Sequence, residues 1–128
     1  MSATCSTDVL AANVRLLQAI DAGDWETYAS LCDAGLTCFE AEAEGHLVTG
    51  LPFHKFYFDL PGSDSPRLSS ISSPNVRVVG DVGIVCYVRL VQKVDACGDP
   101  YVSTVDETRI WQKIDGTWKH IHVHRSAC

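Results

Sequence analysis

The sequence predicts a single α+β domain over residues 1–128, in which a strongly curved antiparallel sheet wraps around N-terminal helices. Three observations predict this class: apolar residues at helical spacing over residues 7–22, a second helix signal directly after Gly23, and four strand-like runs in the last half. A chain of 128 residues is long enough for one core and too short for two. Residues 1–6 are expected to form a disordered tail.

Two helices are predicted to form a hairpin at the N-terminus. The first carries a stripe of residues at helical spacing, and Gly23 ends the helix. The stripe consists of Leu10, Val14, Leu17 and Asp21, with Ile20 beside it. Asp24 is a good N-cap for the second helix, DWETYASLC, because its carboxylate can accept from a free amide of the first turn.

The middle of the chain is predicted to hold two short strands and a short helix. The stretch GLTCFEAEAEGHLVTG has strand-like runs on both sides of a turn at Gly45. The stretch LPFHKFYF is expected to be an aromatic helix with Pro52 in its first turn. The stretch LPGSDSP that follows is expected to be a loop.

The last half is predicted to be an antiparallel meander, and its final turn, IDGT, decides which side chains share a face. A two-residue turn pairs Ile114 with Thr117 and places Arg109 on the face of the histidines in KHIHVHRS. A three-residue turn, with Gly116 as a left-handed bulge, pairs Lys113 with Thr117 instead.

The three-residue turn is the favoured register. It keeps Ile121 and Val123 with Trp111 on one mostly apolar surface, and it places Arg109 opposite Ile121. Arg109 and Arg125 then share the apolar face.

Three arginines on three successive strands are therefore expected to point toward the inside of the curved sheet. Arg89 shares its strand face with apolar and aromatic residues, and Arg109 and Arg125 follow on the next two strands. Buried guanidinium groups stay charged and need anions, supplied by protein carboxylates such as Glu107 or by a bound acid. The alternative is that each arginine is an ordinary surface or salt-bridged residue.

The histidines of the last strand do not predict a metal site. His120, His122 and His124 alternate along the strand and spread over about 13 Å, at ~3.3 Å per residue, so three of them do not easily share one ion. A half-exposed strand face at a subunit contact is the preferred interpretation. No metal and no other cofactor is predicted.

Composition and charge narrow the function classes. The net charge of −6 argues against nucleic acid and against anionic membranes, and no apolar stretch has the length of a membrane span. The N-terminus does not read as a signal peptide. The cysteines show no metal-binding spacing; we interpret Cys32, Cys38 and Cys86 as small core residues and Cys5 and Cys128 as tail thiols, which favours a reducing, cytoplasmic location.

Long runs of the chain resemble a known family. DWETYASLCDAGLTCFEAEAEGHLVTGLPFHKFYF, PNVRVVGD, YVRLVQKVDACGDP and ETRIWQKIDGTWKHIHVHRSA are similar, in order, to the association (hub) domain of calcium/calmodulin-dependent protein kinase II, across about residues 8–127. The resemblance implies the nuclear-transport-factor-2-like cone, which agrees with the α+β prediction.

The resemblance also implies two functions. The first is assembly into two stacked rings of roughly a dozen or more identical subunits, either as the hub of a kinase holoenzyme, to which kinase-bearing relatives could contribute, or as a free-standing ring. The second is a pocket for small carboxylates or acidic groups, lined by Arg89 in YVRL, Arg109 in ETRIW and Arg125 in HVHRS, with His54 in FHKFYF near its mouth.

The chain departs from the full kinase pattern. It has no glycine-rich nucleotide loop and no basic amphipathic segment for calmodulin, so neither kinase activity nor direct calmodulin binding is expected. In the animal kinases the loop after FYF carries a tryptophan that covers the pocket, and DLPGSDSP has none, which puts a lid in doubt. The family's usual HRSG ending is HRSAC here.

A small enzyme of the same cone fold, of the isomerase or dehydratase type, is the alternative. Its base would have to be His54, Asp106, Glu107 or a tyrosine such as Tyr57 or Tyr87. Nearby arginines would lower the pKa of a carboxylate and make it a poor base, so we expect no catalytic residue and no enzyme activity.

Overall fold

The computed structural model describes residues 2–61 and 66–127. Its helices are α1 (Ser2–Ala22), α2 (Trp25–Leu31), the 3-10 turn η1 (Ala41–Ala43) and α3 (Pro52–Asp59). Its strands are β1 (Cys32–Phe39), β2 (Val48–Thr49), β3 (Leu68–Val79), β4 (Val82–Val94), β5 (Pro100–Ile114) and β6 (Thr117–Ala127). Residues 62–65 of the loop expected after α3, to which the question of a lid belongs, lie outside the described residues.

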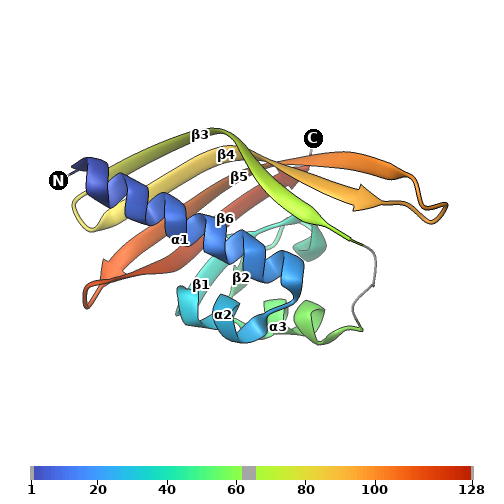
Figure 1. Ribbon diagram of the computed structural model, residues 1–128. Coiled ribbons are helices and arrows are strands. Elements are labelled where there is room, and N and C mark those ends of the chain that lie inside the picture. Colours follow the sequence, from blue (N-terminus) through green and yellow to red (C-terminus); the bar gives the residue numbers. More distant parts are fainter. Residues whose placement is uncertain (1, 62–65, 128) are drawn as a thin grey trace.

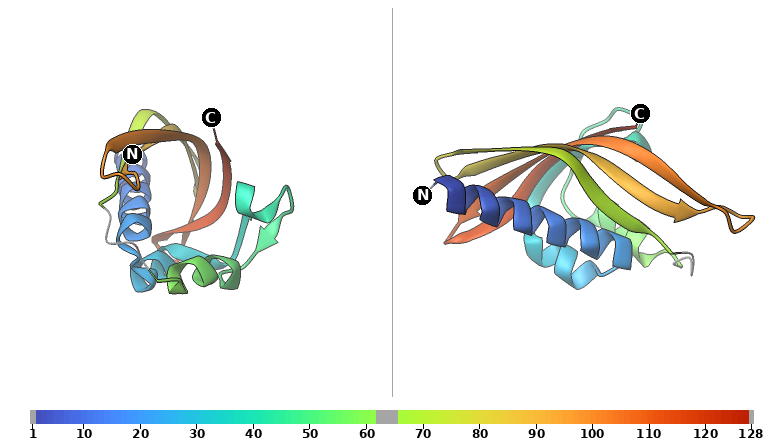
Figure 2. Two further views of the ribbon diagram at one scale, coloured as in Figure 1. Left: turned by 90° about the vertical axis from the view of Figure 1, so that its right-hand side faces the viewer. Right: turned by 45° about the horizontal axis from the view of Figure 1, so that its top comes forward.

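The strands form one bent, open sheet in the order β2-β1-β6-β5-β4-β3. The α+β prediction is confirmed, and the sheet curls around α1 with α2 and α3 at its open end (Figures 1 and 2). The sheet is not wholly antiparallel as predicted, because β1 pairs in parallel with β6. The N-terminal hairpin of helices leads directly into β1. In the sheet, β1 lies beside β6, the last strand in the sequence.

Helix α1 begins at Ser2, earlier than the predicted start at residue 7, so the segment expected to be a disordered tail is helical from Ser2 on. Gly23, with φ +67°, ends the helix, as predicted. The Asp24 carboxylate caps α2 by accepting from the Thr27 amide at 3.1 Å. The buried stripe of α1 differs from the predicted one, because Val14 is exposed.

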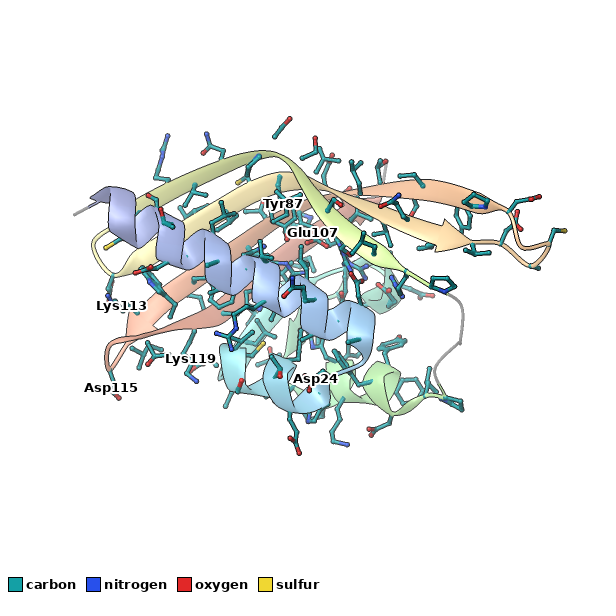
Figure 3. The ribbon with its side chains drawn as sticks, in the orientation of Figure 1. Asp24, Tyr87, Glu107, Lys113, Asp115 and Lys119 are labelled. Atoms are coloured by element: carbon teal, nitrogen blue, oxygen red, sulfur yellow. The ribbon has the colours of Figure 1, made fainter. Side chains whose placement is uncertain are left out.

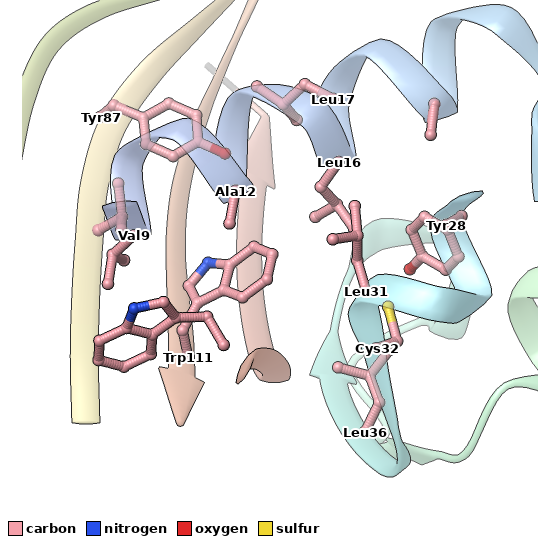
Figure 4. Close-up of a cluster of buried hydrophobic side chains, with 13 residues drawn as sticks. Val9, Ala12, Leu16, Leu17, Tyr28, Leu31, Cys32, Leu36, Tyr87 and Trp111 are labelled. Atoms are coloured by element: carbon pink, nitrogen blue, oxygen red, sulfur yellow. The ribbon is translucent and has the colours of Figure 1, made fainter. Parts of the chain in front are cut away.

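The buried stripe of α1 packs against the inner face of the sheet (Figure 4). It also includes Asn13, a polar residue that the apolar pattern could not place inside. Asn13 accepts from Trp111 Nε1 at 2.9 Å and donates to the Tyr87 hydroxyl at 3.0 Å, so its amide is paired in the core. The apolar members of the stripe are Val9, Ala12, Leu16 and Leu17.

The favoured register of the last hairpin was wrong at its turn. Ile114 pairs with Thr117 across a two-residue turn, and Asp115 and Gly116 both have positive φ, at 51° and 80°. This is the type I′ geometry that matches strand twist and that Asp-Gly favours.

A bulge within the hairpin restores the predicted arginine face. The pairing shifts between Trp111, which faces His120, and Ile110, which faces His122, so Ile121 is an additional residue on β6. Arg109 consequently lies opposite Val123 rather than Ile121.

No helix among the described residues is long and apolar enough to cross a membrane.

Candidate functional site

A cavity of about 220 Å³ opens on the inner face of the sheet, between the strands and the helices α2 and α3. The four side chains predicted for the pocket, Arg89, Arg109, Arg125 and His54, all line it. Arg67, Glu40 and Glu42 line it as well, so the cavity carries charges of both signs.

Strands β4 and β5 supply the most buried charges at the cavity: Arg89 and Arg109 line it, and Glu107 lies behind them. Glu107 lies between two arginines: its Oε2 is 3.3 Å from Arg89 Nη1, and its Oε1 is 3.1 Å from Arg109 Nε. Glu107 also accepts from the hydroxyl of Tyr87, which faces it on β4 (Figure 3). Arg89 Nη2 makes a further ion pair with Asp21 of α1 at 3.3 Å.

The arginines keep Glu107 ionised in spite of its burial. Burial alone would raise the pKa of this carboxyl, but the positive charges of Arg109 and Arg89 outweigh it and lower the pKa to about 2. Burial raises the pKa of Tyr87 to about 12. Glu107 is thus an ionised counter-ion of Arg89 and Arg109 and a weak base.

Arg125 lies nearer the mouth of the cavity and has two acidic partners. Its Nη2 donates to Glu40 Oε2 at 3.0 Å and to Glu42 Oε1 at 2.5 Å. Glu40 follows β1 and is mostly buried, whereas the Glu42 side chain on η1 is 40% exposed. One of the two pairs of Arg125 is therefore open to water and to exchange.

His54 is held in the wall of the cavity by α3. The ring lies 6.0 Å from that of Tyr28, and its Nε2 is 3.1 Å from Glu40 Oε1. Cys38 Sγ lies 3.4 Å from the same nitrogen. Burial alone would raise the pKa of Glu40, but the hydrogen bond from His54 and the charge of Arg125 outweigh it and lower the pKa to about 2.

The three histidines of β6 do not share a face, which corrects the sequence interpretation. The bulge at Ile121 turns His120 into the core, where its Nε2 lies 3.4 Å from Arg109 Nη1. His122 and His124 lie on the other face, against the ring of Phe39. Burial, with the charge of Arg109, holds the pKa of His120 well below its usual value.

Sequence reasoning missed most of the acidic partners of the arginines. Glu107 was foreseen, but Asp21, Glu40 and Glu42 were not assigned to the site. One signal was available: Cys38 and Glu40 are two residues apart at the end of a strand, so the alternation that put Cys38 in the core also turns Glu40 inward.

The comparisons with known proteins agree on one family. Residues 6–128 match the family model of the calcium/calmodulin dependent protein kinase II association domain. The delta subunit of calcium/calmodulin-dependent protein kinase type II from Oryctolagus cuniculus is 43% identical over 123 residues, covering 94% of this chain and 23% of that protein. The chain therefore spans about a quarter of the length of this curated relative.

Solved structures place the fold in the same group. The hub homology domain of the kinase from Chlamydomonas reinhardtii is 48% identical, with a TM-score of 0.92 over 97% of this chain and 98% of that one. The association domain of the C. elegans kinase is 39% identical, with a TM-score of 0.93 over 98% of both chains.

A more distant structure shows the fold alone. A Streptomyces avermitilis protein of the nuclear-transport-factor-2-like family, named as a dehydratase, has a TM-score of 0.82 at 20% identity, over 100% of this chain and 99% of that one. The predicted nuclear-transport-factor-2-like fold is confirmed, and the chain belongs to the association-domain family of calcium/calmodulin-dependent protein kinase II.

Proposed function

We propose that this chain is an oligomerisation hub whose copies associate through apolar side chains that a single subunit leaves exposed. Membership of the association-domain family is the observation that carries the proposal. The surface is consistent with it, because one chain exposes several large apolar side chains, and apolar surface of this kind is typical of contact sites where it is contiguous. On α3 and its end these are Phe56, Tyr57 and Leu60, and on the strands Leu68, Val79, Tyr101 and Val102.

The assembly proposed is the one that the resemblance implies, two stacked rings of roughly a dozen or more subunits. A ring raises the effective concentration of whatever is tethered to its subunits. The curated relative is a subunit of a protein kinase, so kinase-bearing relatives are the partners that such a ring would collect.

Native mass spectrometry of the purified chain at near-neutral pH tests the hub. We expect even-numbered assemblies above about ten subunits. Phe56, 61% exposed on α3, gives a variant: Phe56→Glu should shift the distribution toward smaller species, whereas Gln18→Glu, at an exposed position of α1, should not. A monomer or dimer for the unchanged chain would contradict the proposal.

We further propose that the cavity binds small carboxylates. Arg125 supports this, because a ligand carboxylate can replace the exposed Glu42 without disturbing the buried pairs. Arg67 adds a second available guanidinium: its side chain is 43% exposed, and its ion pair with Asp21 is long, at 3.5 Å. Behind the ligand, the electrostatic potential is set by Arg89 and Arg109, with Glu107 between them.

Calorimetric titration with butyrate tests the pocket. Arg125→Gln should weaken binding about tenfold or more, because a charge-assisted pair is lost, while Arg15→Gln on the exposed side of α1 should not. Equal affinity in both variants would remove the pocket assignment. Ring assembly should survive Arg125→Gln, which separates this result from that of the hub.

A non-catalytic role is proposed in preference to the isomerase or dehydratase alternative. The carboxyl groups with pKa values of about 2, Glu107 and Glu40, are weak bases near neutral pH. Arg109 Nη1 lies 3.4 Å from His120 Nε2 and can donate to it, so the lone pair of that nitrogen is not available to accept a substrate proton. The test is whether the chain catalyses the exchange of ketone α-protons for deuterium in heavy water. Exchange that the chain catalyses and that Glu107→Gln abolishes would overturn this proposal.

A further inference from the structure

Three potential metal ligands meet in and behind the wall of the cavity, apart from the three histidines of β6. Cys38 is the next-to-last residue of β1, Glu40 directly follows that strand, and His54 projects from α3. Cys38 Sγ is 3.5 Å from Glu40 Oε1 and 3.4 Å from His54 Nε2, and the latter two atoms are 3.1 Å apart.

The size of this triangle matches one face of a zinc tetrahedron. Zinc binds thiolate at about 2.3 Å and imidazole or carboxylate at about 2.0–2.2 Å, so ligand atoms at tetrahedral angles lie roughly 3.3–3.6 Å apart. The three separations in the structure are 3.1, 3.4 and 3.5 Å. The donor set of sulfur, nitrogen and oxygen is also one that zinc accepts.

The neighbouring groups leave the right atoms available. Arg125 donates to Glu40 Oε2 and so holds the carboxylate with Oε1 directed at Cys38 and His54, as outer partners of metal ligands commonly do. His54 Nδ1 is buried and has no hydrogen-bond partner among the described residues. Without an ion, His54 Nε2 carries the proton that it donates to Glu40 Oε1. An ion at Nε2 requires the ring proton to lie on Nδ1 instead, and no described group holds Nδ1 in another state.

We propose that Cys38, Glu40 and His54 bind one Zn²⁺ as three protein ligands, with the fourth position open toward the cavity. Glu40 and His54 line that cavity with Arg125, so the fourth ligand is water or the oxygen of a small anion. Binding replaces the thiol proton of Cys38, which is released to solvent. The thiolate and the carboxylate then balance the two charges of the ion.

The test uses the full chain, freed of metal with a chelator and desalted. One equivalent of Zn²⁺ is added, and the zinc retained after a second desalting step is counted per chain. Co²⁺ serves as an optical probe, since a cobalt–thiolate bond gives a charge-transfer absorption in the near ultraviolet. Cys38→Ser and His54→Gln remove one ligand each, and Cys97→Ser removes an exposed thiol as the matched control.

We expect one zinc per unchanged chain and per Cys97→Ser chain, with affinity at least about tenfold weaker in both ligand variants. The cobalt band should be present in the control and absent in Cys38→Ser, whose fold is checked by circular dichroism. Less than stoichiometric zinc in the unchanged chain, or equal affinity in folded Cys38→Ser, would overturn the proposal. The site is independent of ring assembly, which native mass spectrometry reports separately.

Discussion

Glu107 and Arg109 project from the same face of β5, two residues apart, with Glu107 Oε1 3.1 Å from Arg109 Nε. Both side chains are almost fully buried. A buried ion pair contributes little net stability relative to a well-packed apolar pair, but removal of one partner leaves the other charge without compensation. Because Arg89 shares the same carboxylate, Glu107 compensates two cations at once.

Replacement of that carboxylate is expected to destabilise the fold strongly. Glu107→Gln keeps the shape of the side chain and leaves two buried guanidinium groups short of a counter-charge. We expect the free energy of unfolding to fall by about 3–5 kcal/mol, measured by urea denaturation. Asp106→Asn, an exposed neighbour on β5, makes the same chemical change and should cost less than about 0.5 kcal/mol. Equal effects of the two variants would refute the role given to Glu107.

Acid should weaken the fold as its buried carboxylates take up protons. The pKa of Glu107 is lowered to about 2 in the fold and returns toward 4.5 in the unfolded chain, so its contribution is complete above about pH 4.5 and is lost as pH falls toward 2. Glu40, with a pKa of about 2, acts in the same direction. Each group adds at most about 1.4 kcal/mol per pH unit to the slope.

The measurement is a series of urea melts between pH 2 and pH 7. Glu107→Gln should have a shallower slope below pH 4.5 than the unchanged chain, because one linked proton is gone. An identical slope in the two proteins would mean that Glu107 titrates alike in the folded and unfolded states.

His120 should make the fold sensitive to pH in a higher range. Its pKa is held well below 6.5 by burial and by Arg109, so below about pH 6.5 the unfolded chain binds a proton that the folded chain refuses. The free energy of unfolding should therefore decrease as pH falls from 6.5 to 5. His120→Gln should remove this part of the slope, whereas His46→Gln, at an exposed position, should retain it. A slope retained in His120→Gln would assign the effect to another group.

Gly83 is expected to be required because α1 lies directly against β4 there. A Cβ at this position would lie 2.9 Å and 3.0 Å from the two methyl carbons of Val9. Gly83→Ala should cost about 1–3 kcal/mol in the free energy of unfolding. Val9→Ala makes room for the new methyl group, so the double variant should be more stable than the sum of the single effects predicts. Additive effects in this cycle would show that the collision is relieved elsewhere.

The sequence predicted what local chemistry determines. Gly23, Asp24 and Pro52 define helix ends through backbone and capping preferences, and the structure places them as predicted. Alternation along β4 put Arg89 on the inner face, where it is buried. The α+β class and the convergence of the arginines followed from such patterns.

The remainder depended on long-range pairing. The Asp-Gly turn favoured the two-residue register, but that register alone would have put Arg125 on the opposite face of the sheet from Arg109. The bulge at Ile121 determines which face of the sheet the following residues of β6 occupy. Local residue preferences do not predict this bulge, because the packing of His120 beside Trp111 stabilises it. The meeting of His54 with Cys38 likewise needed the position of α3 relative to β1.

The position of β6 has a consequence for synthesis. This strand is the last of the domain in sequence, yet it lies inside the sheet and joins β1 to β5. On the ribosome, the β1–β2 hairpin and the β3–β5 meander must both wait with unpaired edges until residues 117–127 have left the exit tunnel. Edge-on association between nascent chains is a hazard during this interval, and a nascent chain arrested before Thr117 should be recognised by chaperones.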